Sequence, residues 1–371
     1  MKSDPERKEG VSRRQVLQAG FATAAAMAAG VPGPAKAQGQ PAHGAEMRVI
    51  DIHAHYFPET YLDLVATDGK RFDAAYYTTD KGWFIKTPAG GNGPLPTKFI
   101  DLKARIADMD QQGVGLQAIS LTAPMLYWGG AELSTKMAVA WNDAATAAHQ
   151  AYPTRLVSFL TLPMLYPDRA LNELDRARKL PGMRGVYLGT NIGGHDLDDP
   201  LFEPIFAHIE SLDLPVFLHP VETGGERLRN YFLANLIGNP VDTAIAAAHL
   251  IFGGVLDRHP KLQVCLPHGG GVLPILTGRM DQGWKTRGEL KSVPQAPSAY
   301  LQRFTYDTIT HSKPIMEFVI KQVGAERVMI GSDYCFTMGY DQPVKFLDQV
   351  DLTSSQRRMI LGGNAERLLK L

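Results

Sequence analysis

Four short apolar runs in this chain each end in a side chain that can bind a metal ion. The first run ends in a His-x-His pair, His53 and His55, and the other three end in His219, His268 and Asp333. Because side chains alternate along a strand, both imidazoles of the pair face the same side. The carboxyl ends of the strands of an α/β barrel meet at one face, where active sites lie. The pattern therefore predicts a metal site at that end of a barrel.

Eight segments have the character of β-strands, and helical patterns separate them. The expected strands are residues 48–52, 117–121, 155–161, 183–188, 215–218, 262–266, 303–307 and 327–331. The expected helices are residues 100–110, 131–150, 167–179, 200–212, 241–258 and 354–371, the last one interrupted at Gly362-Gly363. Alternating strands and helices favour a parallel sheet. Eight such units predict an α/β protein with a TIM (β/α)₈ barrel of the metal-dependent hydrolase type, spanning residues 46–371.

An insertion at residues 56–97 interrupts this alternation. Asp80-Lys81-Gly82 lies among aromatic residues and predicts a hairpin turn. The glycines and prolines of residues 90–96 predict a loop. The insertion leaves from the active-site end of the barrel. Two interpretations remain open, namely a lid over the site and a hairpin packed across the barrel rim.

Charge and cysteine content narrow the possible partners and ligands. The chain has 38 Lys and Arg and 38 Asp and Glu residues, so its formal net charge is +0. Because it has no basic stripe, we do not expect a nucleic-acid partner. Its two cysteines, Cys265 and Cys335, are too few for a disulfide framework or a Cys-rich zinc site. Metal binding must therefore rely on imidazoles and carboxylates.

The first 37 residues have the features of a twin-arginine export signal. Residues 12–17 contain the arginine pair, residues 21–31 form an Ala-rich apolar segment, and Ala35-Lys36-Ala37 provides a small-x-small cleavage site. The apolar segment is too short to span a bilayer. We therefore expect a signal peptide at residues 1–37, a periplasmic location and no membrane attachment after cleavage.

The ligand types also restrict the metal. Imidazole and carboxylate donors favour Zn²⁺, with Mn²⁺, Fe²⁺ and Co²⁺ as alternatives. No lysine or glutamate ends the expected strand at residues 183–188, where such a residue would bridge a second ion. We therefore expect one divalent ion. The His-Gly-Gly-Gly string at residues 268–271 also occurs in lipases, but the chain lacks their Gly-x-Ser-x-Gly motif.

At these residues the chain resembles the amidohydrolase superfamily, and more narrowly its carboxy-lyase branch, typified by 2-amino-3-carboxymuconate-6-semialdehyde decarboxylase. The resemblance extends from about residue 48 to residue 371. The motifs that carry it are residues 51–55, 105–110, 215–220, 260–271, 331–334 and 363–365.

The resemblance implies a role for each site residue. The implied metal ligands are His53, His55, His219 and Asp333. His268 would be the catalytic acid and base, with Asp333 beside it. It would take a proton from metal-activated water and return a proton to the substrate carbon. Arg279 would reach the site of a partner subunit and hold the carboxylate of a small-molecule substrate. A homodimer is thereby implied.

Two positions depart from the family pattern. Pro96 stands where a second carboxylate-binding arginine is expected, and Val221 stands where an aromatic residue is expected. The substrate is therefore not expected to be the aminocarboxymuconate semialdehyde itself. The leading hypothesis is a non-oxidative decarboxylase of an aromatic or unsaturated carboxylate. A hydrolase of a lactone, ester or amide and a periplasmic ligand-binding protein are the alternatives.

Overall fold

The computed structural model describes residues 48–221, 223–290 and 292–371. Contacts divide the chain into Met1–Ala45 and Glu46–Leu371, and the description below concerns the second unit alone. The export signal expected at residues 1–37 lies outside the described residues. Within them, no helix combines the length and hydropathy needed to cross a membrane.

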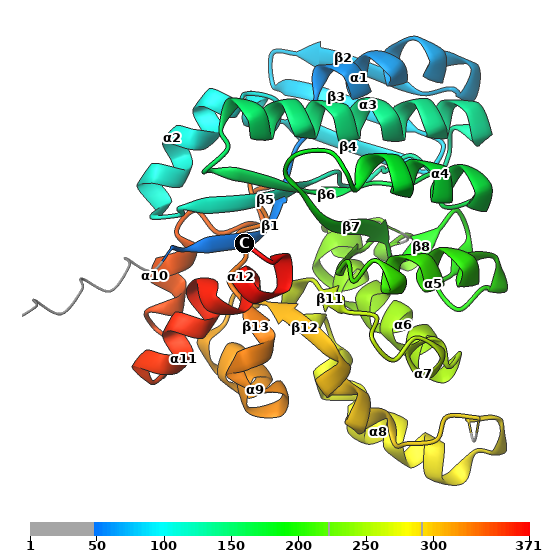
Figure 1. The fold of residues 1–371 in the computed structure, drawn as a ribbon, viewed down its shortest axis with the longest axis vertical. Coiled ribbons are helices and arrows are strands. Elements are labelled where there is room, and N and C mark those ends of the chain that lie inside the picture. The colour runs from blue at the N-terminus through cyan, green and yellow to red at the C-terminus, as the bar shows by residue number, and fades with distance from the viewer. Residues whose placement is uncertain (1–47, 222, 291) are drawn as a thin grey trace, which may run out of the picture. The chain divides into compact units, whose positions relative to one another are not determined.

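Eight parallel strands form the barrel, as the sequence predicted (Figure 1). Each expected strand is present, with ends shifted by a few residues. In sheet order the strands are β1 (Ile50–His55), β5 (Leu116–Ser120), β6 (Leu156–Leu160), β7 (Met183–Gly189), β10 (Val216–His219), β11 (Val264–Leu266), β12 (Phe304–Asp307) and β13 (Val328–Met329). These strands are almost entirely buried, as expected where helices cover a parallel sheet.

The barrel closes between β1 and the extended segment that follows β13. The Ile52 amide donates to the Ile330 carbonyl at 2.9 Å, and the Asp333 amide donates to the His53 carbonyl at 2.8 Å. β13 itself has only two residues, so these bonds replace a regular ladder. This seam, defined as β1 and residues 330–334, therefore brings two of the expected ligand segments together.

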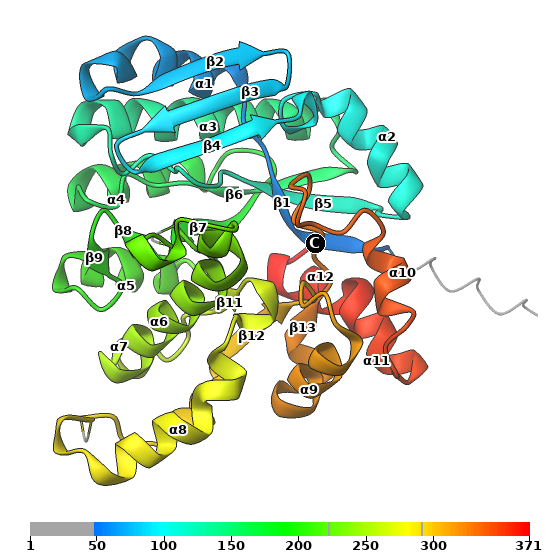
Figure 2. The same ribbon diagram turned by 180° about the vertical axis from the view of Figure 1, so that it is seen from behind.

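Helices surround the strands (Figures 1 and 2). They are α2 (Leu102–Gln112), α3 (Gly130–Ala151), α4 (Pro167–Ala177), α5 (Glu203–Ser211), α6 (Asn239–Phe252), α7 (Val255–Arg258), α8 (Leu273–Thr286), α9 (Lys313–Val323), α10 (Pro343–Leu347), α11 (Ser354–Arg358) and α12 (Asn364–Leu369). A π-helical segment, Met359–Gly363, separates α11 from α12, which confirms the expected interruption. The helix expected at residues 241–258 is split into α6 and α7, because Gly254 between them has φ 71°.

The helices α9 and α10 were not among the expected elements, and neither was α8. Ile275 and Leu276 are exposed on it, so its apolar residues do not mark one buried face in the way that sequence patterns require. By contrast, α2 has clear end signals. The Asp101 side chain accepts the Ala104 amide at 3.0 Å, and Gly113 ends the helix with φ 71°.

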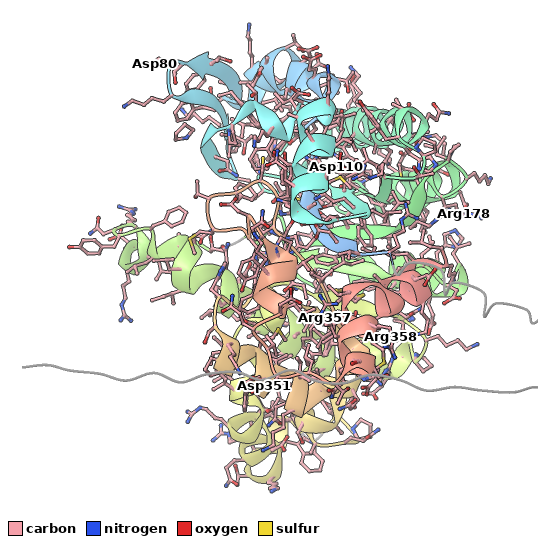
Figure 3. The ribbon with its side chains drawn as sticks, turned by 90° about the vertical axis from the view of Figure 1, so that its left-hand side faces the viewer. Asp80, Asp110, Arg178, Asp351, Arg357 and Arg358 are labelled. Atoms are coloured by element: carbon pink, nitrogen blue, oxygen red, sulfur yellow. The ribbon has the colours of Figure 1, made fainter. Side chains whose placement is uncertain are left out.

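The insertion forms α1 (Glu59–Ala66) and a three-stranded antiparallel sheet, β2 (Ala75–Thr79), β3 (Gly82–Thr87) and β4 (Gly90–Leu95). Figure 2 shows this sheet beside α1 and α3, and Figure 3 shows Asp80 at the tip of the expected hairpin. The loop prediction for residues 90–96 was wrong. Backbone pairing with β3 makes most of this segment a strand, because ladder hydrogen bonds need no side chains.

The hairpin packs across the barrel rim rather than standing free. Trp83 is buried, with its ring centroid 5.3 Å from that of Phe57 and 6.0 Å from that of Phe99. Its indole N–H donates to the Pro96 carbonyl at 2.9 Å. Phe57 lies just after the end of β1, so these contacts hold the hairpin against the end of the barrel. They favour the rim-packing interpretation over the lid.

Candidate metal centre

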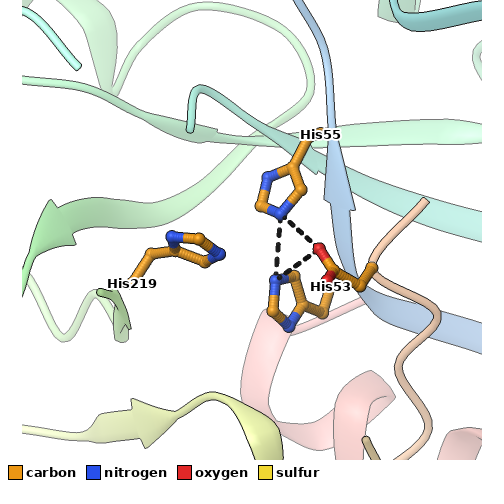
Figure 4. A group of neighbouring side chains, drawn as sticks. His53, His55 and His219 are labelled. Carbon is orange, nitrogen blue, oxygen red and sulfur yellow. Dashed lines mark hydrogen bonds and ion pairs between the residues drawn. The ribbon is translucent and has the colours of Figure 1, made fainter. Parts of the chain in front are cut away.

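Four of the five expected residues bring their ligand atoms within 4.8 Å of one another. They are His53 and His55 on β1, His219 at the end of β10 and Asp333 after β13, and all four are buried. The Nε2 atoms of His53 and His55 are 3.0 Å apart. The Asp333 Oδ1 atom is 2.9 Å from the His55 Nε2 atom. Figure 4 shows the three imidazoles directed toward a common point.

Hydrogen bonds fix the orientation of two of these imidazoles. The His219 Nδ1–H donates to the Pro220 carbonyl at 3.1 Å, while its Nε2 atom is buried without a hydrogen-bond partner among the described residues. The His53 Nδ1–H donates to the Asp307 carboxylate at 2.7 Å. Both rings thus leave Nε2 free to bind a cation. An orphaned buried nitrogen beside two further imidazoles and a carboxylate fits a divalent ion.

The electrostatics of the site suit metal ligands. Burial lowers the pKa of His55 to about 4 and also lowers the pKa of His219 well below its usual value. Burial opposes ionisation of Asp333, but the neighbouring imidazoles of His268 and His55 hold its pKa well below the usual range. For His53, burial is outweighed by three nearby carboxylates, those of Asp307, Asp333 and Asp51, which raise the pKa. The site therefore offers two neutral imidazoles and an anionic carboxylate, the forms that metal binding requires.

Two of the expected site residues have left-handed backbones. His268 has φ 55° and Asp333 has φ 58°, a region that non-glycine residues rarely occupy. Such strained conformations persist where the surrounding structure holds them, and they are common at functional sites. Here they direct both side chains toward the centre of the barrel, where the His268 Nε2 atom lies 3.9 Å from the Asp333 Oδ2 atom.

Asp307 is a site residue that sequence reasoning missed. Its Oδ2 atom accepts from His53, and its Oδ1 atom accepts from the amides of Gly269 at 2.9 Å and Ile309 at 3.0 Å. The carboxylate thus links a metal ligand to the peptide that follows His268. The available signal was its place as the last residue of an expected strand, where the other site residues also lie.

A cleft of about 300 Å³ lies beside the metal centre, lined by both His268 and Asp333. Its other polar lining residues are Asn235, Asn239, Thr310 and His311. None of the described residues that line it is a lysine or an arginine. Arg279 is exposed on α8 and does not line this cleft, so its role in substrate binding remains a prediction.

A larger cleft of about 510 Å³ lies beside Lys98 and Asp108, and none of the metal ligands lines it. Phe336 lines this cleft, and its ring centroid is 5.3 Å from that of His55. The phenyl ring thus lies between this cleft and the metal centre. Because only the smaller cleft is lined by His268, we take the smaller one as the substrate site.

Comparisons with known proteins agree with this geometry. An amidohydrolase family model matches residues 50–371. The 2-amino-3-carboxymuconate-6-semialdehyde decarboxylase of Dictyostelium discoideum is 31% identical over 332 residues, covering 87% of this chain and 91% of that protein.

Solved structures show the same fold. The 5-carboxyvanillate decarboxylase of Sphingomonas paucimobilis superposes with a TM-score of 0.75 at 26% identity, covering 88% of this chain and 100% of the other. The 5-carboxyvanillate decarboxylase of Novosphingobium aromaticivorans, solved with manganese, has a TM-score of 0.74 at 23% identity, covering 88% and 98%.

Proposed function

The chain belongs to the amidohydrolase family, and from this premise we propose that it is a metal-dependent, non-oxidative decarboxylase of an aromatic or unsaturated carboxylate. One observation carries the proposal. His268 stands 3.9 Å from the carboxylate of a three-histidine, one-aspartate centre, in a chain that aligns with 91% of a decarboxylase. The hydrolase and ligand-binding alternatives have no comparable support.

The reaction breaks the bond between the substrate carbon and its carboxylate, and the electron pair stays on that carbon as CO₂ leaves. A divalent ion, when bound, supplies positive charge that stabilises the developing carbanion. His268 delivers a proton to the same carbon. Its left-handed backbone and the hydrogen bond that the Gly269 amide donates to Asp307 hold the imidazole at the cleft. The cleft walls include the apolar side chains of Leu236 and Ile315, which can contact the apolar part of a substrate.

The cleft also supports a choice among substrates. A volume of about 300 Å³ is at the small end of ligand pockets and suits a single ring. Because no cation from this chain lines it among the described residues, the cleft offers no partner for a second carboxylate. The amides of Asn235 and Asn239 and the imidazole of His311 can instead bind neutral hydroxyl or carbonyl groups. We propose a substrate with one ring and one carboxylate.

A homodimer that shares Arg279 is part of this proposal. The outer face, our name for the exposed apolar surface beside the cleft, consists of Tyr231, Phe232, Leu236, Ile237, Val241, Ile245, Ile275 and Leu276. It includes residues of α6 and α8, which contact each other, and its first segment stands out in yellow-green at the left of Figure 3. Exposed apolar surface of this extent is typical of an interface. Arg279 lies one helical turn after Ile275, so a partner on this face would meet its guanidinium.

The identity of the ion is also a proposal. Three imidazoles and one carboxylate favour Zn²⁺, whereas Mn²⁺ accepts the same donors and was present in a structurally similar decarboxylase. Metal-free protein reloaded with each ion separately distinguishes the two. We expect Zn²⁺ to restore activity, and recovery with Mn²⁺ alone would reject Zn²⁺ as the native ion.

Periplasmic location by twin-arginine export completes the proposal. It is supported by the arginine pair at residues 13–14 and by the Ala-x-Ala sequence that ends at Ala37. Replacing both arginines by lysine is expected to keep the protein in the cytoplasm. Cell fractionation measures this, and unchanged export would contradict the assignment.

The central experiment offers the metal-loaded protein a series of ring carboxylates, lactones and amides. We expect CO₂ release, and in D₂O we expect one deuterium on the carbon that lost the carboxylate. Products that carry solvent oxygen at a cleaved acyl group would show a hydrolase instead. Tight ligand retention without any turnover would show a binding protein.

A further inference from the structure

A buried polar network joins the two ligand segments at the barrel seam. The Asp51 Oδ1 atom accepts from the His53 amide at 3.1 Å and from the Ser332 amide at 3.0 Å. Its Oδ2 atom accepts from the Ser332 hydroxyl at 2.5 Å. His53 is itself a candidate ligand, and Ser332 directly precedes the ligand Asp333. One carboxylate therefore ties together two segments that are about 280 residues apart in the chain.

The network continues from the seam to the helix layer. Gln117 on β5 donates to Asp51 at 2.8 Å through its amide nitrogen, and its amide oxygen accepts from Arg105 on α2 at 2.6 Å. Arg105 also donates to the carbonyl of His55, the second ligand of β1. The guanidinium lies 4.6 Å from the centre of the Tyr334 ring. It therefore contacts both strands of the seam.

Burying these polar and charged side chains lowers the stability of the fold compared with apolar packing. The network is therefore expected to have a role that apolar side chains could not perform. Asp51, Gln117 and Arg105 are each 0% exposed, and well-packed apolar residues are often at least as stable as a buried ion pair. Charge balance alone would need only a direct contact between Arg105 and Asp51. Gln117 separates the two charges, so that one reaches the His53 amide and the other reaches the His55 carbonyl.

We propose that Asp51, Gln117 and Arg105 are positioning residues, which hold the seam in the conformation that binds the metal ion. They act through the backbone of His53, His55 and the residue before Asp333. The inference rests on the metal centre of the proposed function and does not depend on the reaction. Metal affinity, rather than turnover, is therefore the quantity that tests it.

A second buried network provides a matched control. The Asn142 amide nitrogen donates to the Thr161 carbonyl at 3.0 Å and to the Glu173 carboxylate at 2.7 Å, and its oxygen accepts the Thr161 amide at 2.9 Å. Asn142 is 0% exposed, as Gln117 is. Its network joins α3, α4 and the residue that follows β6, and none of these hydrogen bonds involves a metal ligand. Loss of either amide removes buried hydrogen bonds, but only Gln117 connects to the seam.

The experiment compares Gln117→Leu with Asn142→Leu in the full-length protein. Zn²⁺ affinity is measured by competition with a chromophoric chelator, and thermal unfolding is measured with and without Zn²⁺. We expect Gln117→Leu to weaken Zn²⁺ binding about 10- to 100-fold, the effect usual for groups that orient metal ligands, and to shrink the thermal shift that Zn²⁺ produces. Asn142→Leu should lower both unfolding temperatures and leave Zn²⁺ affinity unchanged.

A milder variant, Ser332→Ala, removes the hydroxyl bonds to Asp51, to the His53 carbonyl at 3.5 Å and from the Tyr334 amide at 3.1 Å. All three lie within the seam, and the bond from the Ser332 amide to Asp51 is kept. It should fold and weaken Zn²⁺ binding by less than Gln117→Leu does, so it tests the proposal even if the larger change prevents folding. Wild-type Zn²⁺ affinity in Ser332→Ala, together with wild-type affinity in any folded Gln117→Leu protein, would overturn the positioning role. Failure of the unaltered protein to bind either Zn²⁺ or Mn²⁺ would instead overturn the metal centre, and the network proposal with it.

Discussion

Folded proteins usually bury apolar side chains and expose charged ones. The barrel seam instead buries charged side chains, and the outer face instead exposes apolar ones. Asp51 of the seam and Arg105, which contacts the seam from α2, are 0% exposed, whereas on the outer face Tyr231 is 84% exposed and Ile275 is 60% exposed. Buried charges and exposed apolar patches both lower stability unless something compensates. The seam has its compensation inside the chain, in hydrogen bonds and a candidate cation site. The outer face has no such compensation among the described residues, and the proposed homodimer would supply it by burying this surface.

The largest effect is expected when a metal ligand at the carboxyl ends of the barrel strands is removed. His219→Ala takes away one of three imidazoles, and its Nε2 atom has no other described partner to lose. We expect loss of stoichiometric metal and essentially complete loss of decarboxylation, with the oligomeric state unchanged. Metal content by atomic spectroscopy and CO₂ release measure the two effects. Retention of a full metal equivalent would show that His219 is not a ligand.

His268→Ala separates proton transfer from metal binding. The imidazole lies beside the ligand Asp333 but outside the group of four ligand atoms. We expect the variant to keep its metal and to lose about 10²- to 10⁴-fold in kcat, the range for a positioned general acid or base. Loss of metal on this change would mean that His268 is a ligand, and the assigned role would then be wrong.

Asp307→Asn tests the carboxylate that orients His53. The amide can no longer accept a charge-assisted bond from the imidazole N–H, although it still fills the same space. We expect metal affinity or activity to fall about 10- to 100-fold. The metal titration used for the seam variants measures this. Wild-type metal affinity in Asp307→Asn would show that the carboxylate is not needed to orient His53. Its role would then be to accept hydrogen bonds from the Gly269 and Ile309 amides.

The metal centre could be predicted well from the sequence. Side chains alternate along a strand, so His53 and His55 lie on one face, and the other ligands lie at strand ends that meet at the same end of the barrel. Asp307 ends a strand as well, but an aspartate at a strand end has many ordinary explanations. The Gln117 and Arg105 contacts could not be predicted, since they depend on how α2 packs against β1 and β5. Patterns within one segment carry no information on such contacts.

The outer parts of the fold were predicted less well. Gly90–Leu95 was expected to be a loop, because glycine and proline are poor strand formers, yet pairing with β3 makes it a strand. The helix α8 was missed because its apolar residues are not confined to a buried face. The exposed Ile275 and Leu276 that hid the helix from sequence analysis are also part of the outer face, which the proposed dimer would cover.

The smallest expected effect on the fold is at the outer face, where Ile275→Gln should disturb association and little else. An exposed position contributes within about 0.5 kcal/mol to folding, whereas burying an isoleucine in an interface contributes about 1.5–3 kcal/mol. The dimer dissociation constant should therefore rise by roughly tenfold or more. Sedimentation velocity over a concentration series measures it. Tyr77→Gln, at a side chain that is 49% exposed on β2 and outside the outer face, is the control and should associate as the wild type does. If the wild type, Ile275→Gln and Tyr77→Gln all associate equally, the outer face is not the dimer interface. Arg279 would then not reach the site of a partner subunit through this face.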